Sequence, residues 1–252
     1  MNQALIQAGL LFLTGLVAGI LNVIAGGGSL LTLPVMIFLG LPATVANGTN
    51  RVAILIQNIG AVWSFQRKRL ISGRWLLLSV PPALVGAVLG TVAAVRVGDL
   101  AFQRILAVVM VGVAVLTLWR PVHVGDGKAH PPASGLSRGV FALIFFAVGF
   151  YGGFIQAGVG FVILGAAAVG GLDLVRGNAL KVTLVLSFTP LALAIFAWSG
   201  KVDWAMGFAL AAGNLLGGLA GVHVQVLKGH RWVRKVVTVV VVLFAAKLLL
   251  GG

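Results

Sequence analysis

Two glycine-rich breaks interrupt the apolar sequence, and each is followed by amide and cationic side chains. The first break, residues 26–29 (GGGS), leads to Arg51, and the second, residues 157–160 (AGVG), leads to Lys181. Glycine lets the backbone approach a ligand closely, and the N–H groups at the start of a helix attract anions. A guanidinium group suits the paired oxygens of a sulfonate, sulfite or carboxylate. The spacing therefore predicts a binding site for a small anion.

The residues expected at this site share one of three properties: a bare backbone, an amide or hydroxyl group, or a positive charge. The predicted substrate-binding residues are Gly26, Gly27, Gly28, Ser29, Asn47, Thr49, Asn50, Arg51, Gln57, Gln156, Gly158, Gly160, Asn178 and Lys181. Other polar residues could either line the path of a substrate or form hydrogen bonds between helices. For each of them taken singly, the hydrogen bond between helices is favoured. They are Asn58, Thr183, Ser187 and Asn214.

Each feature also has a purely structural explanation. The breaks could serve helix packing, Asn47 and Asn178 could be helix N-caps, and Arg51 and Lys181 could extend to interfacial water. Charge inside a membrane segment is costly, however, and points first to function. We therefore interpret both cations as parts of the anion site.

The sequence lacks the groups that catalysis or ATP hydrolysis would need. It has no cysteine and four acidic residues, all Asp in or beside expected loops, and it shows no metal-ligand spacing and no phosphate-binding lysine motif. We therefore expect no enzyme activity, no metal site and no cofactor. His223, the only histidine inside an expected membrane segment, is the candidate for proton coupling.

The elements that must position these residues are membrane helices. Hydrophobic residues make up 60% of the chain and charged residues 9%, against about 25% charged residues in an average soluble domain. Many apolar runs approach the ~20 residues that span a bilayer as a helix, and no alternating strand pattern is present. The sequence therefore predicts an all-α polytopic membrane protein.

The expected segments run between polar or glycine-containing interruptions. They are residues 4–24, 29–39, 46–65, 75–95, 101–119, 138–154, 161–171, 179–198, 204–226 and 232–250. Two of them, 29–39 and 161–171, are too short to span the bilayer at ~1.5 Å per residue. We expect these two to be broken or re-entrant arms, which leaves 8–10 segments depending on how the arms are counted.

The two halves of the chain resemble one another. A shift of 131 positions matches Gly40 with Gly171, Asn47 with Asn178 and the Gly86/Gly90 pair with Gly217/Gly221, and the glycine-rich break itself needs a shift of 132. Two interrupted segments at matching places in two halves are typical of a transporter. The predicted organisation is a first repeat at 1–119, a cytoplasmic linker at 120–137 and a second repeat at 138–252, each repeat with about five helical segments.

Loop charge predicts the topology. The net charge of +14 would indicate nucleic-acid binding in a soluble protein, but here we interpret it as the excess of Lys and Arg that marks cytoplasmic loops. Placing the basic loops at 67–74 and 228–235 inside makes the two repeats inverted and both termini external. The expected partners are a small anion and the lipid bilayer, with no nucleic acid and with a homodimer left open.

The sequence resembles a known family of permeases. The stretches GLVAGILNVIAGGGSLLTLPVMIFLGLPATVANGTNRVAI and YGGFIQAGVGFVILGAAAVGGLDLVRGNALKV, with the two glycine pairs, are similar to the sulfite exporter TauE/SafE family, also called the toluene sulfonate uptake permease (TSUP) group. The resemblance implies a multi-pass permease of the bacterial inner membrane for sulfite, organosulfonates or related small anions. The second break departs from the family's triple glycine, because Val159 stands in its middle.

Repeat, charge and resemblance together predict the function. We expect a proton-coupled secondary transporter with alternating access for sulfite, organosulfonates or sulfocarboxylates, with the anion held between the two short arms. The alternative is a passive anion channel of the same architecture, which the lack of glutamate favours. A membrane-embedded partner protein without transport is a third possibility.

Overall fold

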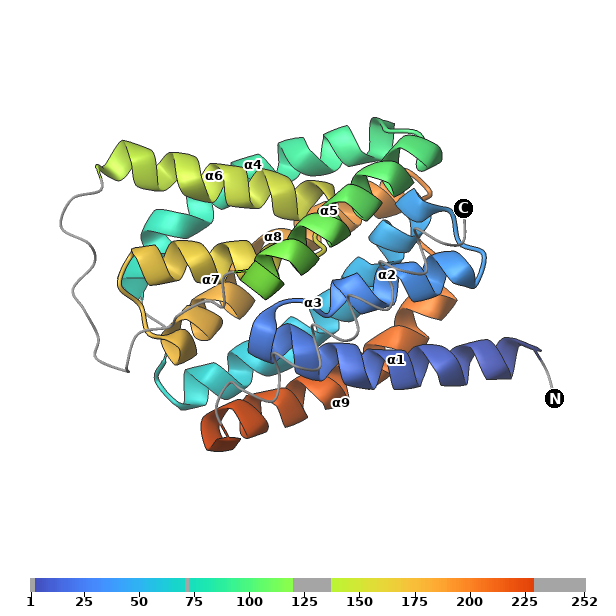
Figure 1. Cartoon of the computed structure of the whole chain (residues 1–252), viewed down its shortest axis with the longest axis horizontal. Coiled ribbons are helices and arrows are strands. Elements are labelled where there is room, and N and C mark those ends of the chain that lie inside the picture. Colours follow the sequence, from blue (N-terminus) through green and yellow to red (C-terminus); the bar gives the residue numbers. More distant parts are fainter. Residues whose placement is uncertain (1–2, 71–72, 120–136, 229–252) are drawn as a thin grey trace.

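The protein is a bundle of helices (Figure 1). The computed structural model describes residues 3–70, 73–119 and 137–228, and the regular structure in those ranges is α-helical. The helices are α1 (Gln3–Ala25), α2 (Ser29–Phe38), α3 (Ala43–Arg67), α4 (Gly73–Arg96), α5 (Asp99–Trp119), α6 (Arg138–Phe154), α7 (Val159–Val169), α8 (Leu174–Trp198) and α9 (Trp204–Lys228). The predicted segment 232–250 and most of the predicted linker 120–137 lie outside the described residues.

The first nine predicted segments are confirmed as helices, and the largest difference is at the start of α8. This helix begins at Leu174 instead of 179, because the Asp173 side chain accepts a hydrogen bond from the Arg176 N–H at 2.9 Å and caps the helix. Helix α3 likewise begins at Ala43, after Pro42. Asn47 and Asn178 are thus each the fifth residue of their helices, and the interpretation of them as N-caps is wrong.

The two short helices follow the two glycine breaks. Helices α2 and α7 have 10 and 11 residues, so each is roughly 15 Å long, about half the thickness of the hydrocarbon core. The turns before them use left-handed backbone, with φ of +80° at Gly26 and +73° at Gly158. Glycine adopts such angles at little cost in conformational energy, whereas other residues are strained by them. The breaks therefore place two helix starts inside the bundle.

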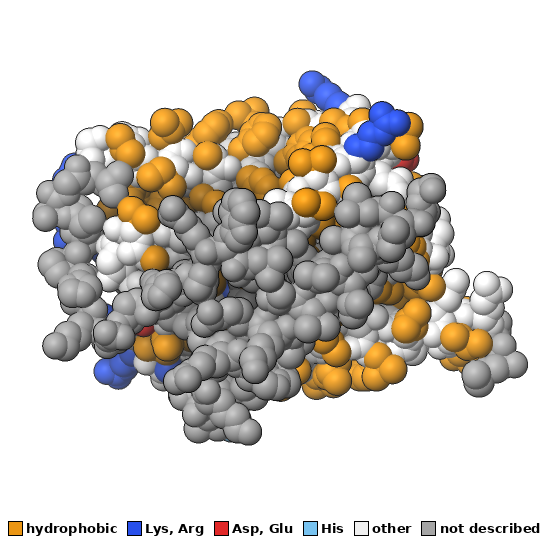
Figure 2. All heavy atoms as spheres, in the orientation of Figure 1, with side chains coloured by type: hydrophobic (Ala, Val, Ile, Leu, Met, Phe, Trp, Pro, Cys, Tyr) orange, Lys and Arg blue, Asp and Glu red, His pale blue; other side chains and the backbone are white. Residues whose placement is uncertain are grey.

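The surface is that of a membrane protein. Four helices in the described part are long and apolar enough to cross a bilayer, within Gln3–Ile24, Gly73–Arg96, Val175–Trp198 and Trp204–His223. Large apolar side chains such as Leu77 are exposed along them. Figure 2 shows hydrophobic side chains spread over much of the visible described surface, with Lys and Arg gathered toward the two ends of the long axis.

Helices from opposite halves of the sequence pack in pairs through glycine. Helix α1 packs along α9, and α4 along α6, with α3 and α8 in contact between the two pairs (Figure 1). A Cβ on Gly86 of α4 would lie 2.1 Å from the Phe146 carbonyl oxygen of α6, and one on Gly213 of α9 would lie 1.9 Å from the Phe12 carbonyl oxygen of α1. The backbones of each pair therefore touch directly, as small residues in membrane helices allow.

Candidate functional site

The two glycine breaks meet at the centre of the bundle. A Cβ on Gly26 would lie 2.3 Å from the Cα of Gly160, and a Cβ on Gly160 would lie 2.2 Å from the Cα of Gly26. Real Cβ atoms do not approach other atoms so closely, so only glycine fits at either position. The break after α1 and the break before α7 are thus in backbone contact, although 134 residues separate the two glycines in the sequence.

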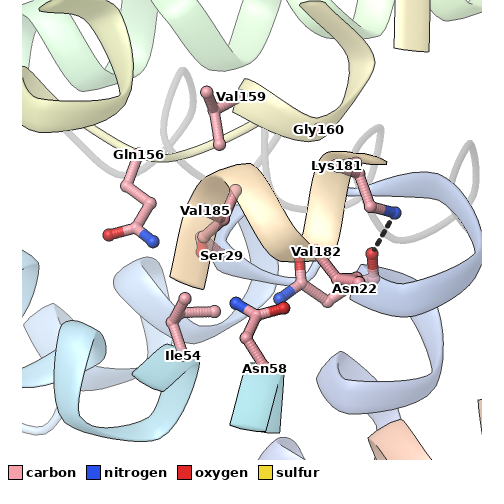
Figure 3. A pocket seen from close by; sticks show the side chains of 10 residues that line it. All are labelled: Asn22, Ser29, Ile54, Asn58, Gln156, Val159, Gly160, Lys181, Val182 and Val185. Carbon is pink, nitrogen blue, oxygen red and sulfur yellow. Dashed lines mark hydrogen bonds between the residues drawn. The ribbon is translucent and has the colours of Figure 1, made fainter. Parts of the chain in front are cut away.

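A small cavity lies beside this contact (Figure 3). It is lined by Asn22, Ser29, Ile54, Asn58, Gln156, Val159, Gly160, Lys181, Val182 and Val185. These residues come from α1, α2, α3, the α6–α7 connection, α7 and α8. The cavity has room for about one water molecule. It is therefore a small pocket with polar and apolar residues in its wall.

Two amides in this cavity lack hydrogen-bond partners. Gln156 is 2% exposed and Asn58 is 3% exposed, yet both amide atoms of Gln156 and the Nδ2 of Asn58 make no hydrogen bond. In Figure 3 the two amides lie around Ser29. The Ser29 oxygen accepts a hydrogen bond from Asn50 at 2.9 Å, which leaves its own O–H available to donate. Since buried polar groups are nearly always paired with protein or with ordered water, these groups are available to bind a ligand or water in the cavity.

Gln156 is held in a strained conformation. Its φ of +56° is one of two positive values at non-glycine residues in the described chain, and such angles cost on the order of 1–3 kcal/mol. Strain of this kind concentrates at functional sites. In the short turn from Phe154, where α6 ends, to Val159, where α7 begins, it directs an unpaired amide into the cavity.

Arg51 is fully buried in α3 and contacts the end of α6. Its Nη2 donates to the carbonyl oxygens of Gly152 at 3.2 Å and Gly153 at 2.5 Å. The guanidinium carbon lies 4.8 Å from the centre of the Phe196 ring, and Nε and Nη1 have no hydrogen-bond partner. Because Arg51 is 0% exposed, the interpretation that it extends to interfacial water is wrong.

Lys181 is buried in α8 and contacts the end of α1. Its Nζ donates to the carbonyl oxygens of Asn22 and Val23, both at 2.8 Å, and to Oδ1 of Asn178 at 2.5 Å. Three acceptors occupy all three N–H groups of an ammonium ion. Lys181 is 3% exposed, so the interpretation that it extends to interfacial water is wrong for this residue too.

The two cations and the two repeated asparagines thus form the same arrangement twice. Asn47 donates to the Phe154 carbonyl oxygen at 2.9 Å, beside the bonds of Arg51, and Asn178 donates to the Ile24 carbonyl oxygen at 3.4 Å, beside those of Lys181. In each case a cation and an amide bind the last carbonyl groups of a helix from the opposite half of the sequence. Positive charge there stabilises the negative end of the helix dipole.

The other predicted residues divide between the cavity and its surroundings. Ser29, Gln156, Gly160 and Lys181 line the cavity. The Asn50 side chain binds Ser29 and Thr32 at the start of α2. The remaining predicted glycines lie in the two turns: Gly26, Gly27, Gly28 and Gly158.

Three predicted residues face elsewhere. The Thr49 oxygen accepts a hydrogen bond from the N–H of Asp203, just before α9, at 2.8 Å. Gln57 accepts from Asn22 at 2.9 Å and donates to the Gly19 carbonyl oxygen. His223 is exposed near the end of α9 and does not line the cavity.

The sequence favoured a hydrogen bond between helices for Asn58, but in the structure this residue lines the cavity. Asn58 follows Arg51 by seven residues, which is about two helical turns and therefore the same face of α3. That spacing is the signal that could have ranked it higher. The site as a whole offers amide and hydroxyl donors beside a buried cation, which suits the binding of an anion.

Comparisons with known proteins show which family the chain resembles. The model of a family described as sulfite exporter TauE/SafE matches residues 11–248. The chain is 30% identical over 243 residues to the probable membrane transporter protein YfcA of Escherichia coli strain K12, covering 96% of this chain and 89% of that protein. It is 28% identical over 240 residues to a probable membrane transporter protein of Haemophilus influenzae, covering 95% and 93%. No solved structure matches the chain significantly.

Proposed function

Because the chain belongs to the sulfite exporter TauE/SafE family, we propose that it is a secondary transporter for small organic or sulfur-containing anions. Sulfite, organosulfonates and sulfocarboxylates are the proposed substrates. Transport is coupled to protons and proceeds by alternating access. The family and the transporters named among its relatives support membrane transport and give no support to an enzyme.

One observation carries the proposal: the unpaired donors of Gln156 and Asn58 face a cavity where the two breaks meet. The first residues of both short helices, Ser29 of α2 and Val159 of α7, line the same cavity. The starts of two helices, each with roughly half a positive charge, therefore converge on it. Lys181 adds a full charge at its wall when protonated. An oxoanion would accept hydrogen bonds from the unpaired amide N–H groups of Gln156 and Asn58, and its charge would be balanced by that of Lys181.

The helix pairs support the proposed inverted repeat. Helix α1 packs on α9 as α6 packs on α4, and α3 contacts α9 as α8 contacts α4. Exchanging the first and second halves of the chain converts each pair into the other, as a twofold axis between inverted repeats requires. With this arrangement we propose the repeats at 1–119 and 138–252, the linker 120–137 between them, and both termini external. We also propose a place in the bacterial inner membrane, with dimer formation left as an open prediction.

A cavity with room for about one water molecule is too small for a sulfonate, so the bundle must open for binding. In the proposed cycle the two short arms separate toward one side of the membrane and then toward the other. A carrier of this kind never opens a continuous path. This distinguishes it from the channel alternative.

Transport measurements test the function. The purified protein is first screened for thermal stabilisation by sulfite, sulfonates and carboxylates, because a ligand that binds only the folded state raises stability. Flux of the best ligand into proteoliposomes is then measured with and without a pH gradient. We expect accumulation against a concentration gradient when the pH gradient is present. Flux without accumulation would indicate a channel, and no flux of any anion would indicate a non-transporting membrane protein.

Replacement of the cavity amides is expected to separate binding from stability. Gln156→Leu puts an apolar side chain of comparable size in place of a buried amide that has no partner, so its melting temperature should equal or exceed that of the wild type. Lost hydrogen bonds to the anion should lower affinity about ten-fold or more. Asn58→Leu should behave similarly.

Asn50→Leu is the matched control, because its amide atoms are hydrogen bonded to Thr32 and Ser29. It should lower the melting temperature, since it leaves those partners unpaired. Circular dichroism melts and equilibrium binding give the two measurements. Unchanged anion affinity in both Gln156→Leu and Asn58→Leu would remove the amides from the site.

A further inference from the structure

Lys181 differs from every other residue around the cavity because it is the only ionisable one. Its hydrogen-bond partners, two backbone carbonyl oxygens and the Asn178 amide oxygen, carry no charge. The three Asp residues of the described ranges have other partners. Asp99 accepts hydrogen bonds from Thr44, Asp173 pairs with Arg176, and Asp203 accepts from the Met206 N–H.

The helices packed against α8 also provide no counter-charge for Lys181. They are α1, α3, α4, α6 and α7. Their buried or partly buried titratable side chains are Arg51, which binds carbonyl groups of α6, and Tyr151, whose O–H donates to the Ala157 carbonyl oxygen. Arg74 and Arg96 of α4 are exposed at its two ends. A protonated Lys181 is thus a buried cation with no negative partner in the described chain.

Two influences of opposite sign act on the Lys181 proton. Three acceptors favour the ammonium form, and burial without a counter-charge favours the neutral amine. An anion in the cavity supplies the missing negative charge and shifts this balance toward the ammonium form. By thermodynamic reciprocity, protonation of Lys181 must strengthen anion binding by the same factor.

We propose that Lys181 carries the proton that travels with each anion. Lys181 takes up a proton from water when a monoanion enters the cavity, and the ammonium N–H returns it to water when the anion leaves on the other side. Charge balances at each step, since one proton accompanies one negative charge. The inference rests on the proposed transport function and replaces the surface residue His223 as the coupling group.

Proton uptake by the wild-type protein is the first test, because it needs no variant. The probe is methanesulfonate, which remains a monoanion from about pH 5 to about pH 9. It is added to the purified chain in weakly buffered solution containing a pH indicator. We expect net uptake approaching one proton per bound anion at pH values where Lys181 is neutral in the empty cavity and protonated beside the anion. Binding without proton uptake at every pH in this range would overturn the proposal.

Transport by variants is the second test. With an inward proton gradient of one pH unit, wild type should accumulate methanesulfonate about ten-fold, since one pH unit is worth a factor of ten. Lys181→Arg keeps a permanent charge, so it should retain anion exchange across membranes of equal pH but lose the gradient-driven accumulation. Lys181→Met should abolish both the proton uptake and the pH dependence of binding. Gradient-driven accumulation by Lys181→Arg would overturn the proposal.

His223→Gln is the matched control, because this exposed side chain should leave proton uptake and accumulation at wild-type values. If accumulation is lost in His223→Gln and kept in Lys181→Arg, the proton travels through His223. The failure of the proposed function looks different: wild type then shows no exchange of methanesulfonate at all. If the wild type exchanges methanesulfonate but shows no proton coupling, the proposed role of Lys181 is overturned and the proposed anion transport is not.

Discussion

Gly160→Ala is expected to lower both the stability of the protein and its rate of transport. The added Cβ would lie 2.2 Å from the Cα of Gly26 and 2.8 Å from its carbonyl oxygen. Both are backbone atoms, which cannot rotate away as a side chain can, so the two breaks must separate. Overpacking typically costs ~1–3 kcal/mol, occasionally more, and here it also opens the cavity next to Gly160. We expect a melting temperature lowered by several degrees and flux reduced at least ten-fold.

Gly165→Ala is the control on the same short helix. A Cβ at Gly165 meets nothing within 4 Å, and alanine stabilises a helix interior by up to ~1 kcal/mol relative to glycine. Its melting temperature and flux should match or exceed those of the wild type. Equal stability and equal flux in Gly160→Ala and Gly165→Ala would show that the two breaks do not touch tightly.

Arg51→Met is expected to lower stability strongly. It removes the donor from the Gly152 and Gly153 carbonyl oxygens at the end of α6 and the cation that faces the negative end of that helix. Unmaking buried hydrogen bonds to a charged group costs roughly 3–5 kcal/mol. Thermal or denaturant melts of the purified protein measure this loss. Arg51→Lys should recover part of it, since lysine keeps the charge without the planar fork.

The same variants separate two roles for Arg51. If Arg51 positions the α6–α7 turn and Gln156, the stability loss accompanies any loss of anion affinity, and Arg51→Lys recovers both together. If it is also a direct ligand through its unpaired Nε and Nη1, Arg51→Lys recovers stability without recovering anion affinity, because lysine lacks the planar fork. Arg104, exposed on α5, gives the control: Arg104→Met should change stability by no more than ~0.5 kcal/mol.

Much of the fold follows from local properties of the sequence. The lengths of the apolar runs predicted nine helices that the structure confirms, and the glycine breaks predicted the short helices α2 and α7. The early start of α8 was also readable, because Asp173 has the residue type of an N-cap. Which helices pair could not be deduced, since small residues occur along many of these helices. The partner of Gly86 depends on the arrangement of the whole bundle.

The residues of the candidate site were predicted better than the contacts that they make. Ser29, Gln156, Gly160 and Lys181 do line one cavity, as expected from the breaks and the charge. The contacts of the cations with helix ends were missed, because no sequence pattern shows that the last carbonyl groups of α1 lie opposite Lys181. For Asn58 the spacing from Arg51 indicates a shared face of α3, but only the folded structure shows that its amide N–H has no partner.

The pairing of α1 with α9 also sets an order of events during biosynthesis. Trp204, the first residue of α9, is made roughly 180 residues after Ala25, the last residue of α1. At ~5–20 residues per second this delay is on the order of ten to forty seconds. Throughout it the glycine face of α1 has only lipid or the insertion machinery as a neighbour. Helix α1 is therefore made well before its partner α9. A ribosome that stops before α9 leaves a fragment in which α1 lacks its main helix partner.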